Sequence, residues 1–202
     1  MTGFYLALEG IEGSGKSTLG RLLSERLADR QIDTVSVREP GGTELGEELR
    51  RLVLHSGHMS PWAEAALFAA SRAQLAAEVV APALAQGRWV ISDRSYYSSL
   101  AYQGGGRGLG VEAVRRLNET VLNGVLPDLV VVLDVEPEVG FAREIDRDRI
   151  GEGGLALQRV VAQTYRELAA GDDRVMLVDA GATPTELAAI VLEASLERKH
   201  RV

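Results

Sequence analysis

The chain has 202 residues, no cysteine and a formal net charge of −7 at pH 7, which together fit one domain, 1–202, of a cytoplasmic protein. The acidic excess argues against nucleic acid as a partner, because phosphate backbones favour an excess of Lys and Arg. Disulfides and thiolate metal sites are excluded, and the pattern predicts neither a membrane span of about 18 apolar residues nor a basic-then-apolar secretory signal.

Short apolar runs alternate with longer helical patterns along the whole chain. The runs show little polar alternation, as is typical of strands covered on both faces, and predict strands at 4–8, 34–38, 89–92, 129–134 and 175–179. Helical spacing of apolar residues predicts helices at 18–30, 43–55, 61–86, 112–122, 137–146, 155–170 and 184–196. This order predicts an α/β fold with a doubly wound parallel sheet. Two glycine-dense stretches, 104–110 and 151–154, are expected to be mobile loops.

The first predicted strand runs into residues 10–17, which fit the phosphate-loop pattern G-x-x-x-x-G-K-[ST]. Glycines let backbone N–H groups surround phosphate oxygens, Lys16 supplies a cation, and the Ser17 hydroxyl is a ligand for Mg²⁺. A glycine-rich turn with a chance lysine is the alternative, and the flanking strand and helix disfavour it. The predicted ATP or GTP contacts are Gly10, Ile11, Glu12, Gly13, Ser14, Gly15, Lys16, Ser17 and Thr18.

Charged side chains follow two further predicted strands. Asp93 is placed to act on Mg²⁺ or its waters, and Arg94 beside it can form a forked contact with a phosphate. A surface ion pair is the alternative reading of these two residues. Arg38 ends strand 34–38 before a Pro-Gly-Gly turn, where an anion clamp and a solvated charge are equally good interpretations.

The helix predicted at 61–86 is rich in alanine. On a helical wheel of about 100° per residue its polar side chains fall on one narrow stripe, consisting of Glu64, Ser71 and Glu78. Phe68 and Arg72 lie beside this stripe, four residues apart, and either line a pocket or are a peripheral aromatic and a solvated cation. The remaining apolar arc is wide enough to face both the sheet and a second subunit.

Together these segments resemble the bacterial thymidylate kinases, which make dTDP from dTMP and ATP. The matching segments, in the family's order and spacing, are residues 9–18, 38–43, 67–72 and 93–104. The resemblance implies a three-layer α/β/α P-loop NTPase fold with a five-stranded parallel sheet, and a small mobile lid at about 141–156. It also implies ATP with Mg²⁺ as the donor, dTMP as acceptor, and a homodimer formed through the 61–86 helix.

The resemblance further implies roles for individual side chains. The residues expected to bind dTMP are Glu12, Arg38, Glu39, Arg50, Phe68, Arg72, Arg94, Ser99, Tyr102 and Gln103. Among them, Phe68 would stack on thymine, Arg72 would address a base carbonyl, and Glu12 would lie near the 3′-hydroxyl. The expected catalytic residues are Lys16, Asp93, Arg94 and Arg149, and the expected Mg²⁺ ligands are Ser17 and Asp93, partly through water.

The lid departs from the family pattern. Gly151 stands where Glu is usual, Leu157 replaces a Phe, and Val160 and Ala162 occupy positions that are usually basic. Fewer cations are therefore available to stabilise the phosphoryl group during its transfer, so a slower enzyme is one expectation. Arg149 is the expected lid cation, and the alternatives to it are Arg143 and Arg147.

Two rival functions stay open at this point. A kinase for another nucleotide or for a deoxynucleoside is the nearest, although two arginines at strand ends suit a phosphate acceptor better than a hydroxyl. A nucleotide-binding switch or a catalytically silent relative is the second rival, and the thinned lid supports it. A guanine-specific switch would carry an N-K-x-D motif, which the sequence does not contain.

Overall fold

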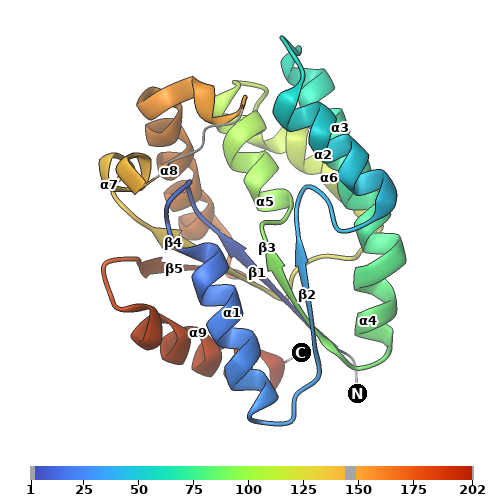
Figure 1. Cartoon of the computed structure of the whole chain (residues 1–202), viewed down its shortest axis with the longest axis vertical. Coiled ribbons are helices and arrows are strands. Elements are labelled where there is room, and N and C mark those ends of the chain that lie inside the picture. The colour runs from blue at the N-terminus through green and yellow to red at the C-terminus, as the bar shows by residue number, and fades with distance from the viewer. Residues whose placement is uncertain (1–2, 144–148, 202) are drawn as a thin grey trace.

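Parallel strands form one sheet in the order β2-β3-β1-β4-β5 (Figure 1). The computed structural model describes residues 3–143 and 149–201. The strands are β1 Phe4–Glu9, β2 Thr34–Arg38, β3 Trp89–Asp93, β4 Leu129–Asp134 and β5 Val175–Asp179. All five predicted strands are confirmed, each within one residue of its expected ends.

Helices connect the strands and cover both faces of the sheet. They are α1 Lys16–Ala28, α2 Glu44–His55, α3 Pro61–Leu75, α4 Ala81–Ala85, α5 Tyr96–Ser99, α6 Val111–Leu122, α7 Pro137–Arg143, α8 Gly154–Gly171 and α9 Pro184–Lys199. Two π-helical segments, η1 Ala76–Val80 and η2 Leu100–Gly106, and a 3₁₀ turn, η3 Gly151–Gly153, complete the described elements. The helix expected at 137–146 is confirmed as far as Arg143, and its last three residues lie outside the described part of the chain.

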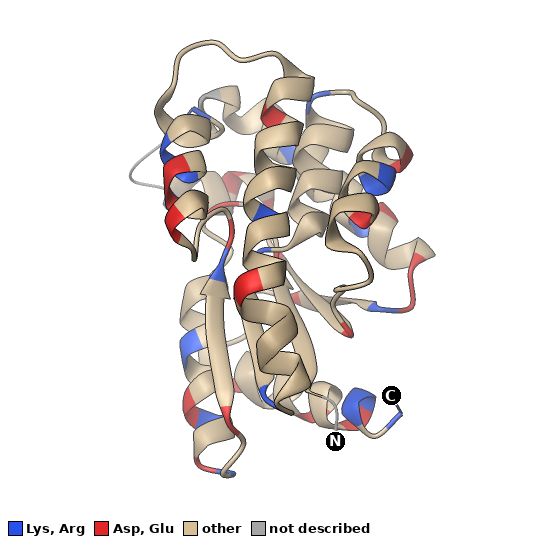
Figure 2. Ribbon diagram, turned by 90° about the vertical axis from the view of Figure 1, so that its right-hand side faces the viewer, with Lys and Arg blue, Asp and Glu red and all other residues tan. Residues whose placement is uncertain are grey.

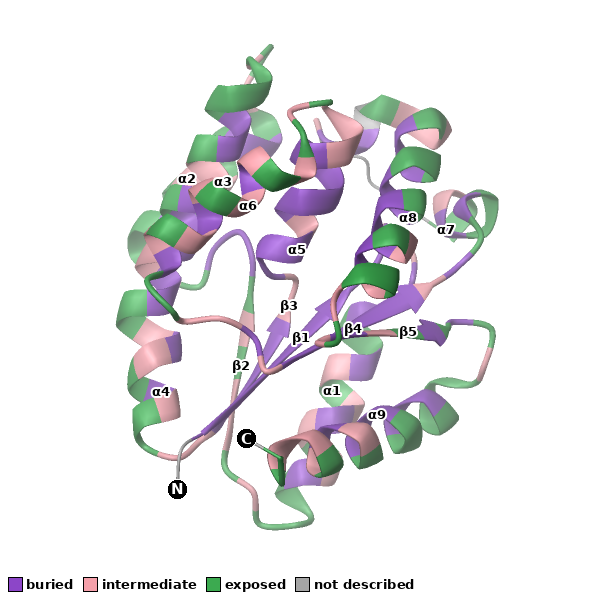
Figure 3. Cartoon of the chain, turned by 180° about the vertical axis from the view of Figure 1, so that it is seen from behind, coloured by how far each residue is buried: buried purple, intermediate pink, exposed green. Residues whose placement is uncertain are grey.

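Alternation along β1 divides the core between the two faces of the sheet. Leu8 packs towards α1, where a Cβ added to Gly20 would lie 3.3 Å from its side chain. Tyr5 faces the opposite layer and packs with Leu75 and Val80. Figure 3 shows the strands of the sheet centre as buried along their length, enclosed by helices whose outer faces are exposed. This is the three-layer α/β/α arrangement.

The sequence prediction for the stretch after β3 was wrong in one respect. Residues 96–106 form α5 and η2 without interruption, so the glycine-dense stretch expected as a loop from residue 104 is helical as far as Gly106. A Cβ at Gly105 would lie 2.2 Å from Thr164 Oγ1, and one at Gly106 would lie 2.5 Å from Leu157. The glycines therefore serve close approach between η2 and α8, a use that composition cannot distinguish from loop flexibility.

The alanine-rich helix is present from Pro61 to Ala85, but it is not one regular α-helix. Its middle turn, η1, is π-helical and precedes Pro82. Proline has no N–H to donate and its ring clashes with the carbonyl four residues earlier, so a widened turn accommodates it. None of the helices within the described residues is long and apolar enough to cross a membrane.

The contact between η2 and α8 leads to a prediction about stability. Gly105→Ala should lower the free energy of unfolding by about 1–3 kcal/mol, because the new methyl group would overlap the buried Thr164 side chain. Gly57→Ala is the matched control, since no heavy atom lies within 4 Å of a Cβ there. Urea unfolding of both variants measures the difference, and equal stability would show that η2 is loosely packed.

Candidate functional site

A cavity of about 370 Å³ opens at the carboxyl ends of the central strands. The register of the sheet pairs Asp93 with both Arg38 and Leu8, so the segments that follow β1, β2 and β3 begin at one edge. All ten residues that the sequence predicted to bind the acceptor line this cavity, namely Glu12, Arg38, Glu39, Arg50, Phe68, Arg72, Arg94, Ser99, Tyr102 and Gln103. The predicted loop and metal residues Lys16, Ser17 and Asp93 line it as well.

The phosphate loop occupies one end of the cavity. Gly15, with φ of +99°, directly precedes α1, and no side chain caps that helix, so its first N–H groups are available to an anion. The Nζ of Lys16 donates to the carbonyl oxygens of Gly10 at 3.1 Å and Ile11 at 2.8 Å. Burial and the charge of Arg94 lower the pKa of Lys16 to about 8. The lysine is thus a buried cation held beside an opening that accepts anions.

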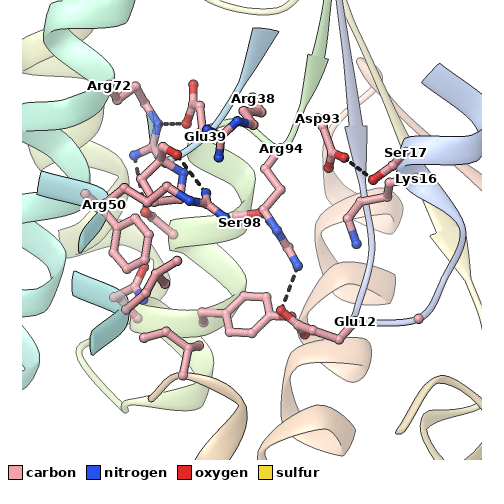
Figure 4. A pocket seen from close by; sticks show the side chains of 18 residues that line it. Glu12, Lys16, Ser17, Arg38, Glu39, Arg50, Arg72, Asp93, Arg94 and Ser98 are labelled. Atoms are coloured by element: carbon pink, nitrogen blue, oxygen red, sulfur yellow. Dashed lines mark hydrogen bonds and ion pairs between the residues drawn. The ribbon is translucent and has the colours of Figure 1, made fainter. Parts of the chain in front are cut away.

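Ser17 and Asp93 meet at the same end. The hydroxyl of Ser17 donates to Asp93 Oδ2 at 2.6 Å, which joins the start of α1 to the end of β3 (Figure 4). Together they present a hydroxyl and a carboxylate at the mouth of the loop. Hard divalent cations such as Mg²⁺ prefer oxygen ligands of this kind.

Arg94 crosses the middle of the cavity and contacts the phosphate loop (Figure 4). Its backbone has φ of +75°, a left-handed conformation that is costly for a residue with a side chain and that recurs at functional sites. Its Nη2 donates to Glu12 Oε1 at 2.7 Å, and its guanidinium lies 5.3 Å above the Tyr102 ring. Burial would raise the pKa of Glu12, but the charges of Arg94 and Lys16 outweigh it and lower the pKa to about 2.

Two supporting residues on α8 and β1 were not predicted. Buried Gln158 donates to Glu12 Oε2 at 2.8 Å and so fixes the other oxygen of that carboxylate. Glu9, at the end of β1, accepts hydrogen bonds from Ser95, Ser98 and Tyr165, the last at 2.7 Å. Glu9 was noted only as the first residue of the matching loop segment, because nothing local indicates that its partners lie about 90 and 156 positions later.

Arg72 holds the far end of the cavity through a buried network. Its Nε donates to Glu39 at 2.5 Å, its Nη1 donates to Ser99 and Asn118, and its Nη2 donates to the Ser95 carbonyl oxygen at 3.1 Å. Burial raises the pKa of Glu39 above its ordinary value in spite of the charge of Arg72. The arginine is therefore a buried part of the cavity wall, which excludes the alternative of a solvated cation. Asn118 on α6 is a further member that sequence reasoning missed.

Arg38 and Arg50 lie along the rim formed by the β2–α2 connection. Arg38 Nη2 donates to both carboxylate oxygens of Glu47, at 2.9 and 3.0 Å, and Arg50 Nη1 donates to the Pro40 carbonyl oxygen at 2.8 Å. Thr43 caps α2 by accepting a hydrogen bond from the Gly46 N–H. Arg38 is thus a rim cation with a carboxylate partner on the neighbouring helix.

The lid arginines lie in different places. Arg149 donates to Glu64 Oε2 at 2.8 Å and to the Val53 carbonyl oxygen at 2.8 Å, which places it on the α2–α3 side of the cavity. Arg143, at the end of α7, lies beside the phosphate loop with Nη1 3.4 Å from the Gly13 carbonyl oxygen. Arg147 lies outside the described residues. Of the two lid arginines in the described part of the chain, it is therefore Arg143 that contacts the loop.

Comparison with known proteins agrees with the geometry. A family model described as thymidylate kinase matches residues 8–189. The thymidylate kinase of Synechococcus sp. strain JA-3-3Ab is 47% identical over 186 residues, which cover 92% of this chain and 91% of the relative. That of Halothermothrix orenii is 42% identical over 194 residues, covering 93% of each chain. That of Idiomarina loihiensis is 40% identical over 199 residues, covering 96% and 97%.

The pair of Arg94 and Glu12 predicts a pH-dependent stability. The pKa of Glu12 falls from 4.5 to about 2 on folding, so its ionised form stabilises the fold above about pH 4.5, and this contribution is lost as the pH falls towards 2. Arg94→Met removes the attractive charge and should cost about 1.5–3 kcal/mol near neutral pH, with a smaller cost in acid. Urea unfolding near pH 7 and near pH 3 measures both values.

Arg21→Met is the control for this measurement. Arg21 pairs with Glu25 on the exposed face of α1, with side chains 62% and 56% exposed, and such pairs contribute little to stability. Its substitution should change the unfolding free energy only slightly at either pH. A loss in Arg94→Met that is the same at both pH values would contradict the role given to Glu12.

Proposed function

The chain belongs to the thymidylate kinase family, and from this we propose how its own residues transfer the γ-phosphoryl group of ATP to the 5′-phosphate of dTMP. The observation that carries the proposal is the single cavity that runs from Lys16 in the phosphate loop to Arg72 (Figure 4). It joins the phosphate loop to a pocket with an aromatic wall and several cations. A donor and a phosphorylated acceptor can meet there in line.

At the donor end, backbone N–H groups of the loop, the N-terminus of α1 and Lys16 would hold the β- and γ-phosphates. A second cavity of about 470 Å³ is lined by Arg143 and, among others, by Asp134, Arg166 and Asp179. Because Arg143 lines this cavity and also contacts the phosphate loop, we place the nucleoside of ATP in this cavity. The loop contacts predicted from the sequence remain the proposed ATP-binding residues.

The residues present fit a Mg²⁺ ion at the donor end. The Ser17 hydroxyl and the Asp93 carboxylate, 2.6 Å apart, are oxygen donors of the type that this ion takes, with phosphate and water completing its shell. When bound, the ion supplies charge neutralisation on the β- and γ-phosphates. Ser17 and Asp93 would hold it, the latter partly through water.

At the acceptor end, Arg94 and Arg38 would orient the 5′-phosphate. A phosphate monoester is already a nucleophile, so the transfer needs no general base, and catalysis comes from positioning and charge neutralisation. Glu12 holds Arg94 in place and would face the 3′-hydroxyl. Phe68 and Tyr102 would enclose the nucleoside, with Arg72 directed at a base carbonyl.

Four further residues complete the proposed acceptor pocket, namely Glu39, Arg50, Ser99 and Gln103. Glu39 and Ser99 would act by holding Arg72, to which both are hydrogen-bonded. Ser99 and Gln103 lie four residues apart on the helical stretch that faces α3. The free-nucleoside rival is disfavoured, because such an acceptor has no phosphate for Arg38 and Arg94 to bind, and its hydroxyl would need a general base.

We also propose that residues 1–202 act as one domain with a lid at about 141–156. Arg143 would serve the transferring group from its present position. Arg149 would join it after a closure that separates it from Glu64. This arrangement would supply two cations from the lid in spite of the apolar residues at 160 and 162.

A homodimer through the 61–86 helix is the proposed assembly. Figure 2 shows that helix as a long, largely uncharged run, whereas the adjacent α2 carries several charges. Large apolar side chains are exposed on these two helices, namely Leu45, Leu52 and Trp62. A second copy packed on this surface would bury them.

The acceptor specificity tests the proposed function. Purified protein with MgATP should release ADP rapidly with dTMP, more slowly with dUMP, and hardly at all with dCMP, dGMP, AMP or thymidine. Lys16→Ala should lower kcat by at least about 10²–10³-fold while the thermal unfolding midpoint stays close to that of the wild type. Near-normal turnover by Lys16→Ala, or equal use of all acceptors, would contradict the proposal.

The lid proposal has its own test. Arg143→Gln and Arg149→Gln should each lower kcat by roughly 10²-fold with smaller changes in KM, because each removes a cation from the transition state. Arg159→Gln is the control, since the exposed Arg159 of α8 is bound to Glu138 of α7 at the protein surface. A variant whose kcat stays within about twofold of the wild type removes that arginine from the catalytic set.

A further inference from the structure

Glu64 on α3 is a buried carboxylate that the proposed chemistry does not use. Its side chain is 1% exposed and lies behind the cavity wall. Its Oε1 accepts from Gln103 Nε2 at 2.8 Å and from Arg107 Nε at 3.2 Å, and its Oε2 accepts from Arg149 Nη1 at 2.8 Å. The carboxylate is thus paired with two guanidinium groups, and a carboxylate accepts hydrogen bonds without donating any.

An acceptor-only partner determines which way the Gln103 amide points. The amide has a donating NH₂ group and an accepting oxygen, and only the NH₂ group can bind an ionised carboxylate. Gln103 lines the cavity, and its Oε1 accepts no hydrogen bond from the described residues. The amide oxygen is therefore the polar atom of Gln103 left for a ligand.

Arg72 supplies the complementary group beside it. Four of its five N–H groups are used by Glu39, Ser99, Asn118 and Ser95, which leaves one N–H on Nη2 without a partner among the described residues. The base end of the cavity thus offers one donor and one acceptor. Thymine and uracil present a carbonyl oxygen next to an N3–H, whereas cytosine presents an amino group next to an unprotonated N3.

We propose that Glu64 is a positioning residue for base specificity, which fixes the Gln103 amide so that the pocket accepts a pyrimidine carrying N3–H and rejects cytosine. The inference rests on the proposed function for the location of the base. It adds the reason why the Gln103 amide presents its oxygen, and not its NH₂ group, to that base. Arg107 acts on the base only through Glu64, and Arg149 does so as long as it remains paired with that carboxylate. Loss of the Glu64 charge would allow the amide to reverse.

Glu64→Gln tests this directly, because a glutamine at this position can donate to Gln103 and permit either amide orientation. The wild type should bind dTMP and dUMP in preference to dCMP. In Glu64→Gln the dTMP-to-dCMP ratio, both of dissociation constants by calorimetry and of kcat/KM, should fall at least about tenfold. The dTMP-to-dUMP ratio should not change, since these two bases share the same edge.

Control variants distinguish a change in the orientation of the Gln103 amide from a general loss of binding or stability. Glu64→Asp keeps an acceptor-only carboxylate and should retain the preference for dTMP even if all affinities fall. Arg107→Gln should also retain it, and Glu78→Gln, an exposed residue on the same helical stripe, should leave binding and turnover unchanged. If Glu64→Gln does not fold, the double variant Glu64→Gln/Arg107→Gln replaces it, because it restores the net charge of the cluster.

The outcomes distinguish the inference from the proposed function. An unchanged dTMP-to-dCMP ratio in Glu64→Gln, or equal losses for all three nucleotides, would overturn the role of Glu64 while leaving the kinase activity intact. A wild type that binds dTMP selectively without turnover would remove the proposed function, and the binding ratios would still decide the inference. Equal wild-type binding of dTMP and dCMP would overturn it as well.

Discussion

The site depends on the need of buried carboxylates for hydrogen-bond donors. An ionised carboxyl group removed from water is tolerated only where donors or cations replace the lost hydration. Glu9 meets this need by accepting bonds from Ser95, Ser98 and Tyr165, and so ties the end of β1 to α5 and α8. The loop that follows Glu9 and the segment that carries Arg94 are thereby held at a constant separation.

The same requirement recurs along the cavity wall. Glu12 is compensated by Arg94, Glu39 by Arg72, and Glu64 by two arginines. Each carboxylate orients a side chain that faces the cavity, so the cations and amides at the surface of the pocket are preset before a ligand arrives. Such preorganisation is what phosphoryl transfer requires, because the protein contributes little covalent chemistry.

Much of the fold and the location of the candidate site could be predicted from the sequence, because the order of strands and motifs determines which residues meet at one edge of the sheet. Parallel strands end at one edge, so a loop motif after the first strand and charges after the second and third predict one site. The helical wheel predicted that Phe68 and Arg72 lie on the same side of their helix, and the structure shows Arg72 buried in the cavity wall. The partners Glu9, Asn118 and Gln158 were not assigned roles, because their contacts join positions that are 46 to 156 residues apart and carry no local pattern. The direction of Arg149 depends on a buried carboxylate across the fold and is likewise absent from any motif.

The bidentate contact between Arg38 and Glu47 has a consequence for the choice among anions. An anion that approaches Arg38 meets a guanidinium whose charge is already partly balanced by a carboxylate, which accepts from Nη2 through both of its oxygens. The attraction left for a small anion such as chloride is therefore weaker than that of an unpaired guanidinium. A phosphate attached to a nucleoside would gain additional contacts at the far end of the cavity, and these would favour its binding over that of a small anion. The rim would thus act as a filter that keeps the site free of common ions at physiological ionic strength.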